Sequence, residues 1–504
     1  MIIWLAWLAG VATALALASV VALWSYGRFA RRARGPQSRS IPVGSDAPLD
    51  RMLAPLEDAH PGQSGAILSI DSRTAFVQRM QSAALARRSI DAMYYIWRDD
   101  LTGRLLAQAL LDAAERGVRV RLLLDDVNIL GRDPTYLALN SHKKIEVRLF
   151  NPIRAREGSI RRGIELLLNL VRYHRRMHCK AWIVDGRWAL IGGRNVGDEY
   201  FDASTGRRRN VRDLDLVLAG SVLRDAARVF DRYWNDGLAL PISALWKKRR
   251  SDLRAFRARL ARHARSAQSR EWRALAPPEA TESLGIEDLC WSRAIRLIAD
   301  PPEKALGSGR SDWLPVELQP MLRGARTEVQ IMTPYFVPGA DGMRDLVEAA
   351  SKGVSVTIIT NTLAVADHIT VHGAYRWYRK PLMAAGVGLF EYYARTPPRP
   401  MLHSKALIVD NQRGFIGSFN FDLRSAFLNT EMGVVFEDDR LMDALRAEFD
   451  WCRHPDQAFR LALAGRFVHW LRDQAVRHKM EPGTSSLRRT VSFVIGHLPI
   501  HRLL

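Results

Sequence analysis

Residues 178–185 read "HCKAWIVD", and residues 403–410 read "HSKALIVD". Both octets place a lysine two residues after a histidine and an aspartate five residues after that lysine, with an apolar run between them. Side chains at alternate positions of an extended strand lie on the same face, so each histidine shares a face with its lysine. One such octet alone is typical of a polar strand end, but two in the same register indicate a duplicated unit.

The residues that follow each octet repeat as well. "IGGRN" places Asn195 seventeen residues after His178, and "IGSFN" places Asn420 seventeen residues after His403. Chance recurrence of His, Lys, Asp, Gly and Asn in one register is improbable. We therefore interpret the two stretches as the two halves of one shared site.

The sequence before each octet carries the same order of elements. Residues 89–126 and 328–361 each contain an extended apolar segment, a segment of helical periodicity that ends at a glycine, and a second extended segment. A strand, a helix and a strand in this order indicate a parallel pair. We expect an α/β fold in which two equivalent domains arose by duplication, because the repeat is long and occurs twice.

Two histidines provide the chemistry of a phosphoryl transfer. A neutral imidazole attacks phosphorus and an imidazolium protonates the leaving oxygen, since an unperturbed histidine has a pKa of about 6.5. Lys180 and Lys405 are cationic donors, and Asn195 and Asn420 are neutral donors, for the equatorial oxygens of the transferring group. The sequence has no cluster with metal-ligand spacing, so we expect no metal and no cofactor, and activity that chelators leave largely unchanged.

Four acidic residues accompany the motif. Alignment of the two halves offers Asp213 and Glu431 as acceptors that orient the histidines through their second ring nitrogen. Asp185 and Asp410 belong to the motif and so to the candidate catalytic set, although their place at a strand end favours a salt-bridge or turn role. Nearby aromatic residues are interpreted as core packing and are left out of the site: Tyr94, Tyr95, Trp97, Tyr335 and His174.

The N-terminus carries a long apolar segment. Residues 2–24 hold no charge over 23 positions, enough helix to cross a hydrocarbon core of roughly 30 Å. The alternative is a secretory signal peptide, but no basic residue precedes the run, and it continues past the small residues of "ALALAS" to Trp24. We predict a transmembrane anchor. Five arginines lie between residues 28 and 39, before the first acidic residue Asp46, and they place the following domains in the cytoplasm.

The chain is strongly basic, with a formal net charge of +21. Such a charge predicts attraction to a polyanion, either nucleic acid or an anionic membrane surface. Residues 245–275 contain eleven Lys or Arg and two acidic residues, with Leu253, Phe256 and Leu260 at helical spacing. This segment is either a solvated linker helix or an interfacial helix on anionic lipid.

The boundaries of the domains follow from these patterns. The tail contains an amphipathic basic stretch at 459–478 and an apolar end at 491–504, which dock on the protein or on the membrane. The three cysteines are widely spaced, which favours a reducing compartment over a disulfide framework. The expected parts are an anchor (1–27), a Pro/Gly/Ser-rich basic tether (28–65), a first domain (66–240), a basic linker helix (241–290), a second domain (291–455) and an amphipathic extension (456–504).

With these residues the chain resembles the phospholipase D superfamily, whose His-x-Lys-x(4)-Asp signature occurs here twice. Within that superfamily it is similar to the bacterial cardiolipin synthases of the C-type branch, from about residue 64 to the C-terminus. The resemblance implies two α/β/α domains with mixed sheets, related by a pseudo-twofold axis, with both histidines at the seam. It also implies a metal-independent, two-step exchange in which His178 forms a covalent phosphohistidine and His403 acts as acid and then base.

The resemblance further implies a membrane-bound phosphatidyltransferase. The acceptor would be phosphatidylglycerol and the donor either phosphatidylglycerol or phosphatidylethanolamine, at the cytoplasmic side of a bacterial inner membrane that the chain crosses once. Phospholipids and an anionic membrane surface are then the expected partners. No nucleic acid is expected, and an accessory membrane protein is left open. The alternatives are a phospholipase D that hydrolyses phosphodiesters and a nuclease of the same superfamily, which the basic charge would also suit.

Overall fold

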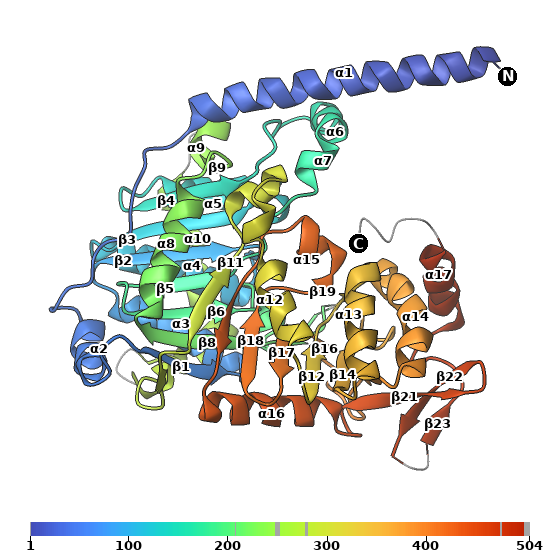
Figure 1. Cartoon of the computed structure of the whole chain (residues 1–504). Helices are drawn as coiled ribbons and strands as arrows, with labels where there is room; N and C mark the ends of the chain where they lie inside the picture. Colours follow the sequence, from blue (N-terminus) through green and yellow to red (C-terminus); the bar gives the residue numbers. More distant parts are fainter. Residues whose placement is uncertain (1, 207, 247–251, 278–280, 474–475, 498–504) are drawn as a thin grey trace.

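The computed structural model describes residues 2–206, 208–246, 252–277, 281–473 and 476–497. Two α/β domains lie against each other, and the long helix α1 (Ile2–Ala33) extends away from the first (Figure 1). The first domain has a mixed nine-stranded sheet in the order β10-β1-β8-β6-β5-β2-β3-β4-β9. Its strands are β1 (Ser64–Ser69), β2 (Ser89–Tyr94), β3 (Arg119–Asp125), β4 (Ile145–Phe150), β5 (Ala181–Val184), β6 (Trp188–Gly192), β8 (Asp215–Gly220), β9 (Ala239–Pro241) and β10 (Cys290–Ser292).

The second domain repeats this arrangement in a ten-stranded sheet, ordered β11-β20-β18-β17-β12-β14-β15-β21-β22-β23. The run β20-β18-β17-β12-β14-β15-β21 corresponds strand for strand to β8-β6-β5-β2-β3-β4-β9, which confirms the predicted duplication. Its strands are β11 (Arg296–Ala299), β12 (Glu328–Met332), β14 (Ser355–Asn361), β15 (Gly388–Tyr392), β17 (Ala406–Val409), β18 (Arg413–Gly417), β20 (Met432–Phe436), β21 (Ala458–Ala464), β22 (Phe467–Arg472) and β23 (Val476–His478).

Helices cover the sheets. In each half, the parallel strands are joined by the helix that the sequence predicts, namely α4 in the first domain and α13 in the second. The main helices of the first domain are α3 (Ser72–Leu85), α4 (Leu101–Glu115), α5 (Asp133–Asn140) and α8 (Val222–Trp234). Those of the second are α12 (Leu314–Arg323), α13 (Gly339–Ser351), α14 (Ile369–Ala384) and α16 (Asp439–Arg453).

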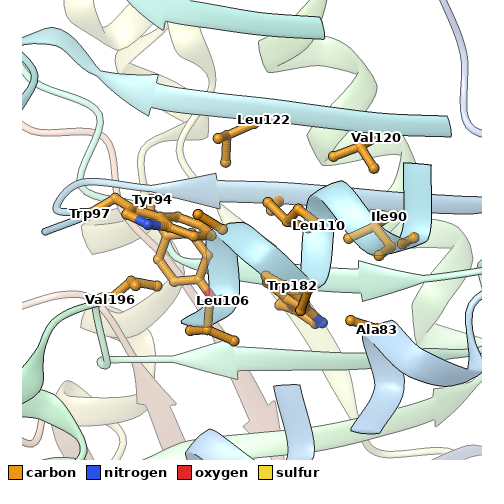
Figure 2. Close-up of a cluster of buried hydrophobic side chains, with 14 of the residues drawn as sticks. Ala83, Ile90, Tyr94, Trp97, Leu106, Leu110, Val120, Leu122, Trp182 and Val196 are labelled. Carbon is orange, nitrogen blue, oxygen red and sulfur yellow. The ribbon is translucent and has the colours of Figure 1, made fainter. Parts of the chain in front are cut away.

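The outer core of the first domain fills the space between its sheet and these helices (Figure 2). Leu106 and Leu110 lie one turn apart on α4 and pack toward Trp182 of β5, with Ile90 of β2 beside them. All four side chains are fully or almost fully buried. Burial of one such side chain contributes about 1.5–3 kcal/mol, so this layer fixes the sheet that carries the first motif.

A second core joins the domains. Ile183 and Ile191 of the first sheet lie in one buried cluster with Ile408 and Val434 of the second. Because side chains alternate along a strand, the residues opposite to the outer core face this seam. The two sheets are therefore packed on each other through their apolar faces, and the motif strands β5 and β17 lie close to the seam.

Of the two alternatives for the basic segment between the domains, a solvated linker helix or an interfacial helix on lipid, the interfacial helix is not supported. The segment forms two helices, α10 (Leu253–Ala264) and α11 (Ala267–Ala274), whose Phe256, Leu260 and Trp272 are buried in the outer core of the first domain. The apolar face therefore packs on protein and is not open to lipid. The basic residues 247–250 lie outside the described residues.

The predicted tether is also docked on the first domain. Helix α1 continues to Ala33, beyond the expected end of the anchor. The Ser40 amide donates to Asp231 at 2.8 Å, and α2 (Pro48–Ala59) buries Leu49 and Leu53 completely. The segment that was predicted to be a tether therefore packs on the surface of the first domain, partly as extended chain and partly as α2.

The amphipathic stretch at 459–478 forms strands that dock on the protein. Phe459 and Leu461 of β21 and Trp470 of β22 point inward, and Gly465 turns the chain between them with φ +58°. Trp470 donates to Glu391 of β15 at 2.7 Å, so the stretch extends the second sheet. Beyond it, α17 (Ser486–Gly496) packs on α14, and residues 498–504 lie outside the described residues.

The two motif aspartates hold strand ends. Asp185 and Asp410 both adopt the left-handed region, with φ of 53° and 54°, which aspartate tolerates better than most residues. Asp185 accepts from the amides of Arg87, Arg88 and Ser89 at 2.8–2.9 Å. Asp410 binds the equivalent amides 326–328 of the second domain. This geometry supports the turn role for these residues and gives no contact with the histidines.

Replacement of Asp185 by alanine should therefore reduce stability more than chemistry. It leaves three backbone N–H groups without their acceptor, and each unpaired buried group costs about 1–3 kcal/mol. We expect a lower Tm in detergent for Asp185→Ala, with kcat per folded molecule close to that of the parent chain. Asp185→Asn, which keeps one acceptor oxygen, is the matched control. A normal Tm with abolished turnover would instead assign Asp185 to catalysis.

Candidate active site

Each histidine is held at the seam by the backbone of the opposite domain. The amide of His178 donates to the carbonyl of Thr430 at 2.8 Å, and the amide of Thr430 donates to Arg176 at 2.9 Å. In the mirrored position, β16 (Met401–Leu402) pairs in parallel with β7 (Val211–Arg212), and the His403 amide donates to Arg212 at 2.7 Å. The backbone that leads to each histidine thus forms hydrogen bonds with the backbone of the opposite domain.

Polar side chains at strand ends fix the residue before each histidine. Asp125, the last residue of β3, accepts from the amide of Met177 at 2.9 Å. Asn361, the last residue of β14, accepts from the amide of Leu402 at 2.9 Å and donates to its carbonyl at 2.8 Å. In both domains, a polar side chain at the end of a strand in the same sheet thus fixes the backbone just before the histidine.

The orienting acids are exchanged between the domains. Nδ1 of His178 lies 2.8 Å from Glu431, and Nδ1 of His403 lies 2.5 Å from Asp213. Alignment of the halves found both acids, but each one contacts the histidine of the other half. The exchange follows from the backbone pairing above, because Glu431 succeeds Thr430 and Asp213 succeeds Arg212. With Nδ1 engaged, Nε2 of each ring is the atom available to substrate.

Both motif lysines are buried beside the histidines. Nζ of Lys180 donates to the carbonyl of His178 at 2.6 Å, and Nζ of Lys405 contacts the carbonyl of His403. Burial lowers the pKa of Lys180 to about 7, with Glu431 opposing the shift. Burial also lowers the pKa of Lys405, which Asp213 opposes. Two cations at this depth favour an anionic ligand.

The two acids differ in their surroundings. Ser418 donates to Glu431, whereas the equivalent residue beside Asp213 is Gly193, where a Cβ would come within 2.1 Å of the Asp213 carboxylate. Burial raises the pKa of Glu431. Burial also acts to raise the pKa of Asp213, but Lys405 and His403 overcome it and lower that pKa to about 2. Asp213 is thus the more firmly ionised of the two.

The pKa values of the two histidines are shifted to different extents, in line with their partner acids. Burial, with Lys180 and Lys405 adding to it, lowers the pKa of His178 well below its usual value. Burial and Lys405 also lower the pKa of His403, but the Asp213 carboxylate opposes them. Neutral imidazole is favoured more strongly at His178 than at His403.

The two asparagines line the same cavity. Oδ1 of Asn195 accepts from the amide of Ile96 at 3.1 Å, which turns its amide group toward the site. Oδ1 of Asn420 is buried and has no hydrogen-bond partner among the described residues. Both side chains lie with His178 and His403 around one cavity of about 790 Å³, so the two histidines and the two asparagines meet at the seam.

Three tyrosines also line this cavity. Tyr95 packs edge-on against the ring of His178, with centroids 4.9 Å apart, and Tyr200 packs likewise on His403 at 5.5 Å. Tyr335 is a further lining residue. Interpreting Tyr95 and Tyr335 as core packing was therefore wrong, whereas Tyr94 and Trp97 do belong to the core. Tyr200 was missed, although it follows Asn195 by five residues.

Arginines surround the cavity and were not predicted. Arg424 lies four residues after Asn420, where the first domain has Glu199 four residues after Asn195. Glu199 forms an ion pair with Arg98 at 3.1 Å. The first domain therefore contributes a neutral ion pair to the cavity, and the second domain contributes the cation Arg424 at the equivalent position. Comparing the two halves position by position could have found this difference. The arginines around the cavity are Arg98, Arg208, Arg209, Arg424 and Arg488.

Two buried histidines with crossed carboxylates meet at the seam of two duplicated α/β domains, beside two lysines and two asparagine amides. This arrangement defines a phospholipase D-type phosphodiester-transfer site. The family model described as cardiolipin synthase, PLD-like domain, matches residues 77–234 and 318–453. The chain belongs to this family.

Relatives match along most of the chain. It is 37% identical over 482 residues to cardiolipin synthase C of Escherichia coli (strain K12), covering 90% of this chain and 99% of that protein. It is 32% identical over 473 residues to an uncharacterized protein of Helicobacter pylori (strain ATCC 700392 / 26695), covering 90% and 92%. The crystal structure of phosphatidylserine synthase from Haemophilus influenzae Rd KW20 has a similar fold, with a TM-score of 0.58 at 12% identity over 90% of this chain and 100% of that one.

The low pKa of Lys180 gives a testable pH dependence. A lysine with a pKa of about 7 loses its charge as pH rises through that value, and with it the attraction for phosphate in the free enzyme. We expect kcat/KM to fall above about pH 7, while the alkaline limb of kcat lies at higher pH because a bound phosphodiester anion favours the charged lysine. Lys180→Arg, which cannot deprotonate in this range, is the control and should remove the limb. A limb unchanged by this substitution would assign the titration to another group.

Proposed function

We propose that the protein is a membrane-anchored cardiolipin synthase, which transfers a phosphatidyl group from phosphatidylglycerol or phosphatidylethanolamine to the glycerol headgroup of phosphatidylglycerol. The twin motif assembled into one site at the seam carries this proposal. The similarity to cardiolipin synthase C over nearly all of both chains supports the choice of substrate class. One phosphodiester replaces another, so the reaction needs no nucleotide.

His178 is assigned as the nucleophile. Its pKa lies well below the usual value because of burial and of Lys180, so its imidazole is neutral at physiological pH. Its Nδ1 faces Glu431, which leaves Nε2 to attack phosphorus. In this step the bond between Nε2 and phosphorus forms as the bond from phosphorus to the donor's alcohol oxygen breaks.

His403 is assigned as the general acid and then the general base. The ionised Asp213 favours a proton on His403 once an anionic phosphodiester offsets the charge of the lysines. His403 gives this proton to the departing alcohol oxygen. It then takes a proton from the headgroup hydroxyl of phosphatidylglycerol, whose oxygen attacks phosphorus and releases His178.

The remaining donors suit the transferring group. Asn195 and Asn420 line the cavity beside the two rings, where the equatorial oxygens of phosphorus carry the charge. Lys180 and Lys405 lie buried directly behind His178 and His403 and add positive charge to this position. Fixed donors in a buried site stabilise such a transition state without solvent reorganisation. This set needs no metal to neutralise the phosphoryl oxygens.

Helix α1 is proposed to cross the inner membrane with both domains in the cytoplasm. Within the described residues, one helix is long and apolar enough to span a bilayer, and it covers Trp4–Ala33. The arginines that follow the apolar run favour the cytoplasmic side by the positive-inside rule.

Lipid analysis tests the proposed reaction. The full chain, expressed in a cardiolipin-deficient bacterium, should restore cardiolipin, and His178→Ala should abolish it. The purified protein in detergent should form cardiolipin when supplied with phosphatidylglycerol, with or without phosphatidylethanolamine. Release of phosphatidic acid alone would assign the chain to hydrolysis. Salt-sensitive DNA cleavage lost in His178→Ala would assign it to the nucleases.

A chromogenic donor separates the roles of the histidines. Phosphatidyl p-nitrophenol has a leaving group that departs without a proton, so the first step does not require His403. We expect His403→Gln to release one nitrophenolate per site and to retain phosphatidyl-His178, detectable by mass spectrometry. His178→Gln should give no burst and no adduct. The reverse pattern, with the adduct on His403, would exchange the two roles.

A further inference from the structure

Beside the catalytic seam, residues 159–173 form a helical pair with an uncovered apolar face. The pair consists of α6 (Ser159–Leu168) and α7 (Leu170–Tyr173) and lies next to α1 (Figure 1). Ile160, Ile164, Leu167 and Val171 recur at helical spacing, and 54–77% of each side chain's surface is exposed. Exposed apolar clusters of this kind mark a site of interaction.

The pair is firmly attached to the first domain through its polar side. The Glu165 carboxylate accepts from the amides of Arg154 and Ala155 at 2.8 and 2.7 Å. Asn151 donates to the carbonyls of Arg172 and Arg175 at 2.9 and 2.8 Å. The apolar face is therefore held outward by a fixed structure.

The same unit binds the anchor helix. The guanidinium of Arg172 lies 3.6 Å from the ring centroid of Tyr26 on α1, and Arg154 donates to Ser25 at 3.2 Å. Between α1 and α6 lies an open hollow of about 930 Å³, lined by both apolar side chains and by arginines, including Ile164 and Arg161. Since α1 is the candidate membrane span, α6 lies beside the C-terminal part of that span.

The pair also reaches the mouth of the catalytic cavity. Arg424, which lines that cavity, donates to the carbonyl of His174 at 3.0 Å, directly after α7. Arg424 belongs to α15 (Leu423–Phe427), whose Phe427 is 51% exposed. His178 follows His174 by four residues. The helical pair is therefore tied to the wall of the catalytic cavity by this hydrogen bond and by the short stretch of chain between His174 and His178.

We propose that α6 and α7 insert their apolar face into the headgroup region of an anionic bilayer and so hold the mouth of the catalytic cavity at the lipid surface. The occupant is lipid because the face adjoins the candidate membrane span, and arginines of α1 and α6, which suit anionic headgroups, lie beside it. A lipid then needs to rise only partly out of the leaflet to bring its phosphate to His178.

Depth-dependent quenching tests this insertion without any turnover. The native cysteines Cys179, Cys290 and Cys452 are buried, so a fluorescent label can be placed on Ile160→Cys or Val171→Cys of the full chain in phosphatidylglycerol-containing nanodiscs. Labels about 5–10 Å below the headgroup boundary should be quenched most by lipids with a nitroxide near the top of the acyl chain. The control label at Arg228→Cys on α8, where the side chain is 80% exposed, should not be quenched.

Two results would overturn the proposal. Labels at 160 and 171 that behave like the label at 228 would exclude insertion. Energy transfer or cross-linking between copies through position 160, without lipid quenching, would assign the face to a second copy of the chain. Both results are readable even if the proposed reaction proves wrong, because no substrate conversion is measured.

A functional comparison follows for the active enzyme. Ile160→Asp combined with Val171→Asp should lower activity on bilayer substrate by about tenfold, since charges are disfavoured below the headgroups, and leave activity in mixed micelles unchanged. Phe467→Asp on β22 replaces a similarly exposed apolar side chain elsewhere and should leave both activities unchanged. An equal loss in both variants, or a loss in micelles as well, would contradict the role of this face.

Discussion

The crossed pairing of each histidine with a carboxylate of the other domain is the interaction on which the site depends. His178 needs Glu431 from the second half, and His403 needs Asp213 from the first. Neither domain alone carries an oriented histidine. The seam core, in which Ile183 meets Ile408, is therefore a catalytic requirement as much as a source of stability, because a small shift between the sheets would separate both pairs at once.

Burial of so many charged groups at one seam has an energetic cost. Two lysines, two acids and two histidines lie almost completely out of water, and each isolated ion would cost several kcal/mol. Their mutual pairing offsets part of that cost, and the packed apolar layers around them offset more. Burial lowers the pKa of Lys180 to about 7, and a bound phosphodiester anion would favour its charged form again.

The sequence was sufficient for the duplicated fold and for bringing the two motifs to one seam, because both rest on local signals. His178 and His403 were found by identical spacing, and the strands by alternating and helical periods. The crossed acids could not be assigned, since the partner of Glu431 depends on how two distant domains pack. The amphipathic character of residues 459–478 was read from the sequence, but their strand structure was not predicted, because basic residues on the open face interrupt the alternation. The apolar face of α6 was not predicted from the sequence. Its apolar spacing is the same as that of a buried helix, and only the exposure of its side chains in the structure distinguishes it.

Duplication by itself would give two equivalent histidines, whereas a two-step transfer needs one nucleophile and one acid. Small differences at equivalent positions supply that distinction. A glutamate with a serine donor faces His178, and an aspartate beside a bare glycine faces His403. The shorter, fully ionised Asp213 holds a proton on its partner more strongly than Glu431 does on His178. The substitutions Glu431→Asp, Ser418→Gly and Asp213→Glu would give His178 the aspartate and His403 the glutamate, and so would oppose this bias while keeping every charge. Under the proposed mechanism, the partners of the histidines, and not the repeated motif itself, distinguish the nucleophile from the acid.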